Sequence, residues 1–128
     1  MEYFPEDKNY LYTIAQFYPR MIVYNDYKGW KNKQFLARGE FALTFGDFDV
    51  ESTVPSDHIL TATGGLQNQD EVLTKDQISK LNKAKPVIIV SPKEVEKKEK
   101  THLKTTKTWK FKAKNVRDFA FASSRKFI

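Results

Sequence analysis

The chain has 128 residues, of which 40% are hydrophobic and 14% aromatic, and it carries a net charge of +6. This length suits one domain, and the apolar content is enough for a single core and too high for a disordered chain. The absence of cysteine excludes a disulfide scaffold, thiolate metal sites and a cysteine nucleophile. No apolar stretch approaches the roughly 20 residues of a membrane span, and the first residues lack the basic start and apolar run of a signal peptide.

The positive charge is concentrated near the C-terminal end of the sequence. Residues 1–92 carry ten Lys/Arg and twelve Asp/Glu, whereas residues 93–128 carry twelve and four. Any electrostatic attraction of a polyanion therefore concerns the last third of the chain.

The first element in chain order is a strand. Residues 10–17 are mostly aromatic or β-branched, which predicts a strand that ends before Pro19. Gly29 and the polar residues 31–33 predict a loop after it.

The clearest pattern lies between residues 40 and 54. Apolar and polar side chains alternate there, which predicts strands with one buried face, and Gly46 interrupts the alternation where a bulge or bend is expected. Residues 54–57 predict a turn, and residues 59–63 predict a short strand closed by the glycines at 64 and 65.

Two short helices are predicted by their caps. Thr74 and Gln77 have the spacing of a capping box, and the helix that they begin should end before Pro86. Residues 91–94 repeat the pattern, with Pro92 at the first helical position, where proline is well tolerated.

The remaining segments predict strands. The apolar run 87–90 suits a buried strand, and residues 108–113 and 116–123 alternate with period two. About seven strands, with no alternation of strands and helices, predict an all-β fold: an antiparallel β-sandwich or saddle-like domain with one or two short helices inserted around residues 74–100.

No self-sufficient active site is visible in the sequence. His58 and His102 stand outside any H-E-x-x-H pattern, and both are expected to be surface histidines. The serine pair that begins at Ser123 lacks the G-x-S-x-G elbow of a nucleophile. Asp47 and Asp49 share one face of a strand, which could suit acid–base work, but solvent-facing alternation explains them more simply.

The basic C-terminal segment interleaves lysines with aromatic residues, as single-stranded nucleic-acid readers do. Alternation, however, puts Trp109 and Phe111 on one face of the strand and Lys110 and Lys112 on the other. A buried aromatic face and a solvated lysine face are therefore expected, with no nucleic-acid partner. The alternative functions that stay open are a basic all-β module for a polyanion, and a module that binds a protein or a carbohydrate.

Three blocks of sequence resemble the N-terminal domain of the aminopeptidase N family of zinc metallopeptidases, in its bacterial branch. The first is FYPRMIVYND with KGW after it, at residues 17–30. The second is RGEFALTFGDFDV, continuing through VPSDH to ATGGLQN, at residues 38–68, and the third is TWKF with NVRDFAFASS, at residues 108–124. Together they run in order from about residue 12 to the end of the chain.

The resemblance implies a β-rich domain packed in front of a thermolysin-like catalytic domain that removes N-terminal residues from peptides. In the family, the zinc ligands, the general-base glutamate and the G-x-M-E-N substrate motif lie on that next domain. This chain contains neither H-E-x-x-H nor Met-Glu-Asn. We therefore expect it to be a non-catalytic segment of a larger enzyme, binding no zinc itself, with the peptide substrate and the catalytic domain of the same parent chain as its partners.

One residue resembles a substrate contact of the family. There, a glutamine or glutamate of the β-domain holds the free α-amino group of the substrate, and Gln16 stands at the similar position. An amide oxygen can accept a hydrogen bond from an ammonium group. The alternative is a glutamine that is satisfied at the end of a strand. The expected loss of neighbouring strands also predicts an unpaired edge at residues 10–17, which could recruit a partner strand.

Overall fold

The structure is a computed structural model that describes residues 1–6, 8–32, 34, 42–83, 92–100 and 103–127. These residues form strands and three short helices, which in chain order are β1 (Glu2–Phe4), β2 (Asn9–Ile14), β3 (Tyr24–Asn25), β4 (Gly29–Trp30), β5 (Gly46–Pro55), β6 (Ile59–Ala62), β7 (Gly65–Leu66), α1 (Gln69–Val72), α2 (Lys75–Lys83), α3 (Pro92–Glu99), β8 (Thr106–Val116) and β9 (Phe121–Ser124).

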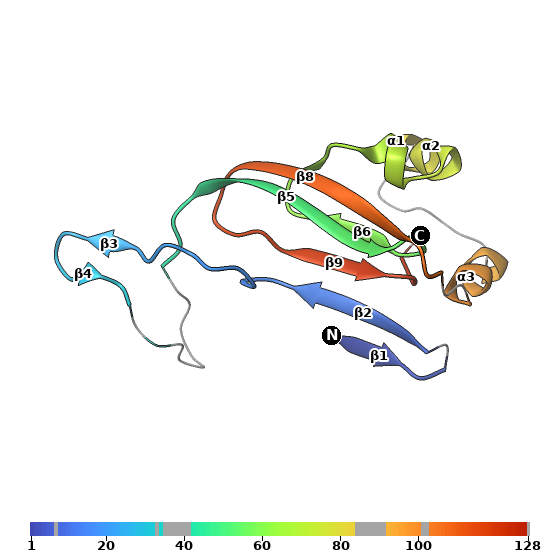
Figure 1. The fold of residues 1–128 in the computed structure, drawn as a ribbon, viewed down its shortest axis with the longest axis horizontal. Coiled ribbons are helices and arrows are strands. Elements are labelled where there is room, and N and C mark those ends of the chain that lie inside the picture. Colours follow the sequence, from blue (N-terminus) through green and yellow to red (C-terminus); the bar gives the residue numbers. More distant parts are fainter. Residues whose placement is uncertain (7, 33, 35–41, 84–91, 101–102, 128) are drawn as a thin grey trace.

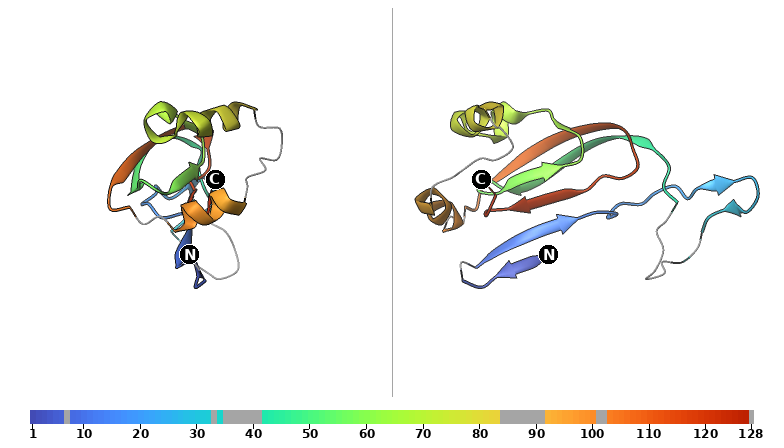
Figure 2. Two further views of the ribbon diagram at one scale, coloured as in Figure 1. Left: turned by 90° about the vertical axis from the view of Figure 1, so that its right-hand side faces the viewer. Right: turned by 180° about the vertical axis from the view of Figure 1, so that it is seen from behind.

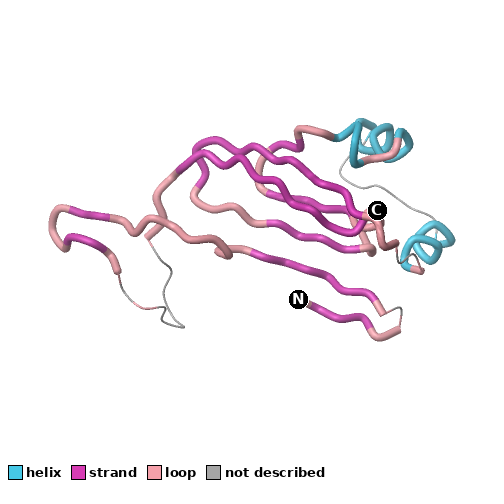
Figure 3. Tube along the Cα trace, viewed as in Figure 1, coloured by secondary structure: helices cyan, strands magenta, loops and turns pink. Residues whose placement is uncertain are grey.

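Two antiparallel sheets form the body of the molecule (Figure 1). One sheet has the strand order β1-β2-β9-β6, and the other has the order β5-β8-β7. A third, two-stranded sheet is the β3–β4 hairpin, which projects from one end, while the helices gather at the opposite end (Figure 2, Figure 3). The prediction of an all-β, sandwich-like fold is confirmed.

The core lies between the two main sheets. Its buried apolar residues come from β6, α1, β8 and the loop before β9, and they are Leu60, Val72, Trp109, Phe111 and Phe119. Residues in β8 alternate between buried and exposed, as the sequence predicted for the aromatic and lysine faces of this strand. The hydrophobic effect therefore fixes which face of β8 points inward.

The long pairing of β5 with β8 includes the irregularity expected at Gly46. The register shifts between Gly46 and Phe48, so the predicted bulge is confirmed at the start of β5. Residues 42–45, however, are loop, and the strand predicted for them is wrong. The reason is that Gly46 already pairs with Val116, the last residue of β8, so no partner strand continues beyond it.

Strand β2 differs from the prediction in its length and its neighbours. It ends at Ile14, three residues earlier than expected, and it lies between β1 and β9 rather than at an edge. The expected free edge is thus covered by β1 over Asn9–Leu11. The β3–β4 hairpin was not predicted, because strands of two residues carry no periodic pattern.

The helices begin where the caps predicted. The backbone N–H of Gln77 donates to Oγ1 of Thr74 over 3.2 Å, and the N–H of Thr74 donates to Oε1 of Gln77 over 2.8 Å, which is a complete capping box. Helix α3 begins at Pro92. The strand predicted at residues 87–90 and the stop at Pro86 lie outside the described residues. The longest described helix, α2, has nine residues, too few to cross a membrane.

Helix α1 is a single turn that the sequence did not predict. The side chain of Asn68 holds it against β8: Oδ1 accepts from the N–H of Lys110 over 3.0 Å, and Nδ2 donates to the carbonyl of Thr108 over 2.9 Å. These bonds join residues some 40 positions apart. Local sequence patterns therefore carry no signal for them.

Candidate functional site

Gln16 lies two residues beyond the end of β2, in a bend rather than at the end of a strand. Its backbone has a φ of +52°, and its side chain is exposed. A residue other than glycine rarely adopts the left-handed region, because its Cβ crowds the backbone. The backbone at Gln16 is therefore turned out of the strand, and the side-chain amide of Gln16 is exposed to solvent.

The residues that follow Gln16 are fixed to the body of the molecule. The ring of Phe17 packs edge-on against Phe121 of β9, with ring centres 5.4 Å apart. Tyr18 packs edge-on against Phe48 at 5.5 Å, and its hydroxyl donates to Oδ1 of Asp118 over 2.6 Å. The exposed Gln16 side chain thus emerges from a clamped backbone.

Asp118 is the centre of these contacts, and we call its hydrogen bonds with Tyr18 and Arg20 the clamp. Arg20 Nη1 donates to the same Oδ1 atom over 3.1 Å, and Arg20 Nη2 donates to the carbonyls of Thr44 and Arg117. Burial raises the pKa of Tyr18, and its hydrogen bond to the Asp118 carboxylate raises that pKa further. The neutral phenol is therefore favoured as the donor.

The β3–β4 hairpin carries an exposed aromatic cluster close behind Gln16 in sequence. Tyr27 is 73% exposed and Trp30 is 55% exposed, and Tyr24 packs edge-on against Trp30 at 5.1 Å. The ammonium groups of Lys28 and Lys31 lie 5.4 and 5.0 Å from the centre of the Tyr27 ring. A two-stranded hairpin of this size has little stability alone, and exposed apolar clusters are typical of interaction surfaces. We call Tyr24, Tyr27 and Trp30 the hairpin cluster.

His58 is buried, and the prediction of a surface histidine is wrong for it. It is 5% exposed, its Nδ1 lies 2.9 Å from Oγ of Ser123, and its ring lies 6.1 Å from that of Tyr12. His58 is fixed by β2 and β9, which are distant in sequence, so its local sequence gave no sign of burial. His102 lies outside the described residues.

The histidine and serine do not make an accessible catalytic pair. Ser123 is only 2% exposed, so no substrate reaches its hydroxyl. Asp57 precedes His58 in the sequence, and its Oδ2 accepts from Arg125 Nε and from the N–H of Leu103, each over 2.8 Å. Burial raises the pKa of Asp57, and the hydrogen bonds from Arg125 and Leu103 outweigh this effect, so the net direction is downward. This polar cluster joins the ends of the sheet strands, which is a structural role.

The lysine face of β8 is largely matched by carboxylates on β5. Lys112 Nζ lies 3.0 Å from Asp49, and Lys110 Nζ lies 3.5 Å from Glu51. Asp47, expected at the surface, is exposed and accepts from the N–H of Asn115 over 2.8 Å. Cross-strand pairing of opposite charges stabilises the sheet and reduces the positive potential that a polyanion would need.

The described residues contain no group of three or more histidine, aspartate or glutamate side chains that could hold a metal ion. They therefore do not fit the zinc ion that the family resemblance implies for a parent enzyme.

Within the part of the chain that the structure describes, Gln16 combines an exposed polar side chain with a fixed backbone, and the hairpin cluster adds exposed apolar surface close to it in sequence. No protein-family model, curated protein or solved structure matches the chain.

Proposed function

We propose that this chain is a non-catalytic N-terminal segment of a zinc-dependent aminopeptidase of the aminopeptidase N family, and that it presents Gln16 to the substrate. The proposal rests on the three sequence blocks at residues 17–30, 38–68 and 108–124. In the parent enzyme the segment forms one side of the substrate cleft, and Gln16 binds the free α-amino group of the peptide.

The structural observation that supports Gln16 as the substrate contact is the conformation of its backbone. Its backbone is held in the left-handed region at φ +52°, while Phe17 and Tyr18 anchor the following residues to β9 and the loop before it. Backbone strain of this kind is concentrated at functional sites. Because the backbone that follows Gln16 is already fixed, less conformational entropy is lost when the side-chain amide of Gln16 binds a ligand.

The chemistry of an amide suits an ammonium group. Oε1 of glutamine accepts a hydrogen bond from a positively charged donor, and such charge-assisted bonds are stronger than neutral ones. A peptide whose N-terminus is held in this way is positioned so that only its first residue extends to the reacting bond. In this proposal the zinc ligands and the hydrolytic step belong to the catalytic domain of the parent, as the family resemblance implies.

The exposed rings of the hairpin cluster favour a contact with a neighbouring domain. Tyr24, Tyr27 and Trp30 are all more than half exposed, on a hairpin that projects from the body of the molecule (Figure 1). Packing of these rings against a second domain would remove apolar surface from water and fix the hairpin. The same contact would bring the Gln16 bend toward the cleft between the domains.

The first test uses the parent enzyme and an aminoacyl p-nitroanilide substrate. Gln16→Ala should lower kcat/KM about ten- to hundredfold, the expected effect of losing one hydrogen bond to a charged group. Gln69→Ala, at an exposed position of α1, is the matched control and should leave kcat/KM unchanged. An unchanged kcat/KM for Gln16→Ala would remove Gln16 from the site.

The second test concerns the parent itself. The gene beyond Ile128 should encode an H-E-x-x-H motif, and the purified 128-residue chain should hydrolyse no aminoacyl reporter. Robust turnover by the chain alone, or a continuation of the gene without such a motif, would contradict the proposal.

A further inference from the structure

Three tyrosine rings form a row on one face of the β1–β2 pair (Figure 1). Tyr3 and Tyr10 are directly opposite each other in the antiparallel register, and their ring centres lie 4.7 Å apart. Tyr12 continues the row along β2, with its ring centre 5.9 Å from that of Tyr10. Residues that are opposite each other, or two apart in one strand, share a face of the sheet. The pairing of the two strands therefore fixes these rings side by side, and we call them the tyrosine row.

One end of the tyrosine row is open to solvent. Tyr3 is 46% exposed, and Tyr10 beside it is partly exposed. A reagent in solution therefore reaches the ring of Tyr3 directly. Two benzene rings that share a carbon–carbon bond have their centres only slightly closer than those of Tyr3 and Tyr10. A bond between the two rings thus needs only a small movement of their side chains, and groups that are held together in this way react far faster than separate ones.

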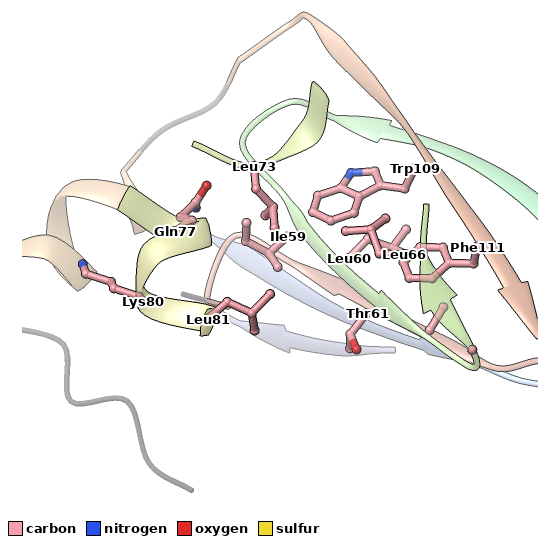
Figure 4. Close-up of a pocket in the computed structure, with 12 residues that line it drawn as sticks. Ile59, Leu60, Thr61, Leu66, Leu73, Gln77, Lys80, Leu81, Trp109 and Phe111 are labelled. Atoms are coloured by element: carbon pink, nitrogen blue, oxygen red, sulfur yellow. The ribbon is translucent and has the colours of Figure 1, made fainter. Parts of the chain in front are cut away.

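Other oxidisable rings of the described chain have different surroundings. Tyr18 packs edge-on against Phe48, and Tyr24 packs edge-on against Trp30. Trp109 lines an apolar groove between β6 and α2, where it is only 1% exposed, so a reagent in solution does not reach it (Figure 4). Among the residues that the structure describes, neighbouring phenols and access to solvent therefore coincide at the tyrosine row.

We propose that Tyr3 and Tyr10 are an oxidative modification site, at which a peroxidase that uses hydrogen peroxide joins the two rings as dityrosine. Each phenol loses one electron and one proton and becomes a phenoxyl radical. The two radicals form one carbon–carbon bond between ring carbons next to the oxygens, and the hydrogens of these carbons then move to the oxygens, which restores both phenols. In total, two hydrogen atoms leave the protein, and they reduce one hydrogen peroxide to two waters.

The bond would fasten strand β1 to the sheet. This strand has only three residues, and it stands first in the order of its sheet, paired with β2. The chain contains no cysteine, so a disulfide cannot supply such a link. A covalent link between strands restricts the unfolded chain, as a disulfide does. The inference does not depend on the function proposed for Gln16, because Tyr3 and Tyr10 pair at the start of β2 and Gln16 follows its end.

The test treats the purified 128-residue chain, at low micromolar concentration, with a peroxidase and hydrogen peroxide. Trypsin cleaves after Lys8 and Arg20, so Tyr3 and Tyr10 fall in different peptides, residues 1–8 and 9–20. We expect the monomeric protein to yield these two peptides as a linked pair, with a mass that is two hydrogen atoms below their sum. Absence of the linked pair, or dityrosine that is confined to covalent dimers, would overturn the proposal.

Two conservative variants identify the tyrosine that is linked in the second peptide. Residues 9–20 contain Tyr10, Tyr12 and Tyr18, but only Tyr10 is opposite Tyr3. Tyr10→Phe should therefore abolish the linked pair. Tyr12→Phe, in the same row and the same peptide, is the matched control and should leave the yield of the linked pair unchanged. Equal yields from the two variants, or a linked pair that persists in Tyr10→Phe, would overturn the proposal.

Unfolding tests whether the fold brings the two rings together. The reaction is repeated in urea, at a concentration that unfolds the chain and leaves the peroxidase active. All six tyrosines can meet in the unfolded chain, so the share of dityrosine that joins Tyr3 to Tyr10 should fall at least about threefold. Peptide mapping measures this share. An equal share in the folded and unfolded chains would mean that nearness in the sequence is sufficient, and it would overturn the proposal.

Discussion

The hydroxyl of Tyr18 donates a hydrogen bond to Oδ1 of Asp118 over 2.6 Å, although the two residues are 100 positions apart in the sequence. The same carboxylate accepts from Arg20, and the Tyr18 oxygen accepts from the N–H of Phe119 over 3.3 Å. These bonds fix the chain that follows Gln16 onto the loop before β9. The clamp thus links the candidate site to the core, because Phe119 is part of the buried cluster.

Tyr18→Phe should destabilise the chain by about 1–2 kcal/mol, because it removes the phenol hydroxyl and leaves part-buried partners of this bond unsatisfied. Urea unfolding of the purified chain measures the change. Tyr24→Phe, which removes the hydroxyl of an exposed ring, is the matched control and should change the stability little. Equal effects of the two substitutions would mean that the Tyr18 bond contributes nothing to the clamp.

Gln16→Gly should leave the stability unchanged or raise it by up to about 1 kcal/mol, because glycine adopts the positive φ without strain but loses more backbone entropy on folding. Gln69→Gly, in α1, should instead lower the stability by about 0.5–1 kcal/mol, since the backbone there is helical. The comparison of the two urea midpoints tests the left-handed backbone at Gln16. A loss of stability at Gln16 as large as that at Gln69 would contradict it.

Gly64→Ala should destabilise the chain by more than about 2 kcal/mol. Its φ is +91°, and an added Cβ would lie 2.3 Å from the carbonyl oxygen of Lys112, so the β6–β7 turn would have to shift away from β8. Gly46→Ala is the control, because a Cβ there would meet nothing within 4 Å. Thermal unfolding of both variants checks the prediction, and a Gly64→Ala protein as stable as Gly46→Ala would disprove the close approach.

Acid should destabilise the chain partly through Asp57. Its pKa in the folded state lies below the unfolded value, so the folded protein binds fewer protons, and this stabilisation is lost as the pH falls below about 4. Asp57→Asn should lower the stability at neutral pH by about 3 kcal/mol, because Arg125 loses its partner, and should make the loss in acid less steep.

The matched control for this pH dependence is Asp49→Asn, which removes an exposed carboxylate that pairs with Lys112. Surface pairs contribute little, so its urea midpoints should follow the wild-type curve from pH 7 to pH 3. A wild-type slope in acid that Asp57→Asn leaves unaltered would exclude Asp57 as a source of the acid sensitivity.

Parts of the fold were predictable because their signals are local. The alternation in β8 placed Trp109 and Phe111 in the core, and the capping box of Thr74 and Gln77 began α2 where expected. Period-two patterning and cap chemistry act within a few residues, so they can be read in the sequence. The chain around Gly46 was predicted only in part, because the end of β8 decided where β5 begins.

The candidate site was less predictable than the fold. The sequence resemblance singled out Gln16, but its left-handed backbone and its clamp depend on Phe121 and Asp118, about 100 positions away. The burial of His58 likewise depends on Ser123, 65 positions later. Contacts of this kind leave no trace in local periodicity.

The sequence by itself determined the all-β class, the inward face of β8 and the starts of α2 and α3, because solvent exclusion and capping act on neighbouring residues. Only the tertiary structure decided that β2 lies between β1 and β9, that β6 is the last of the described strands in its sheet, and that Gln16 projects from a fixed bend. These features depend on which distant strands pair, and strand pairing is set by the packing of the whole core.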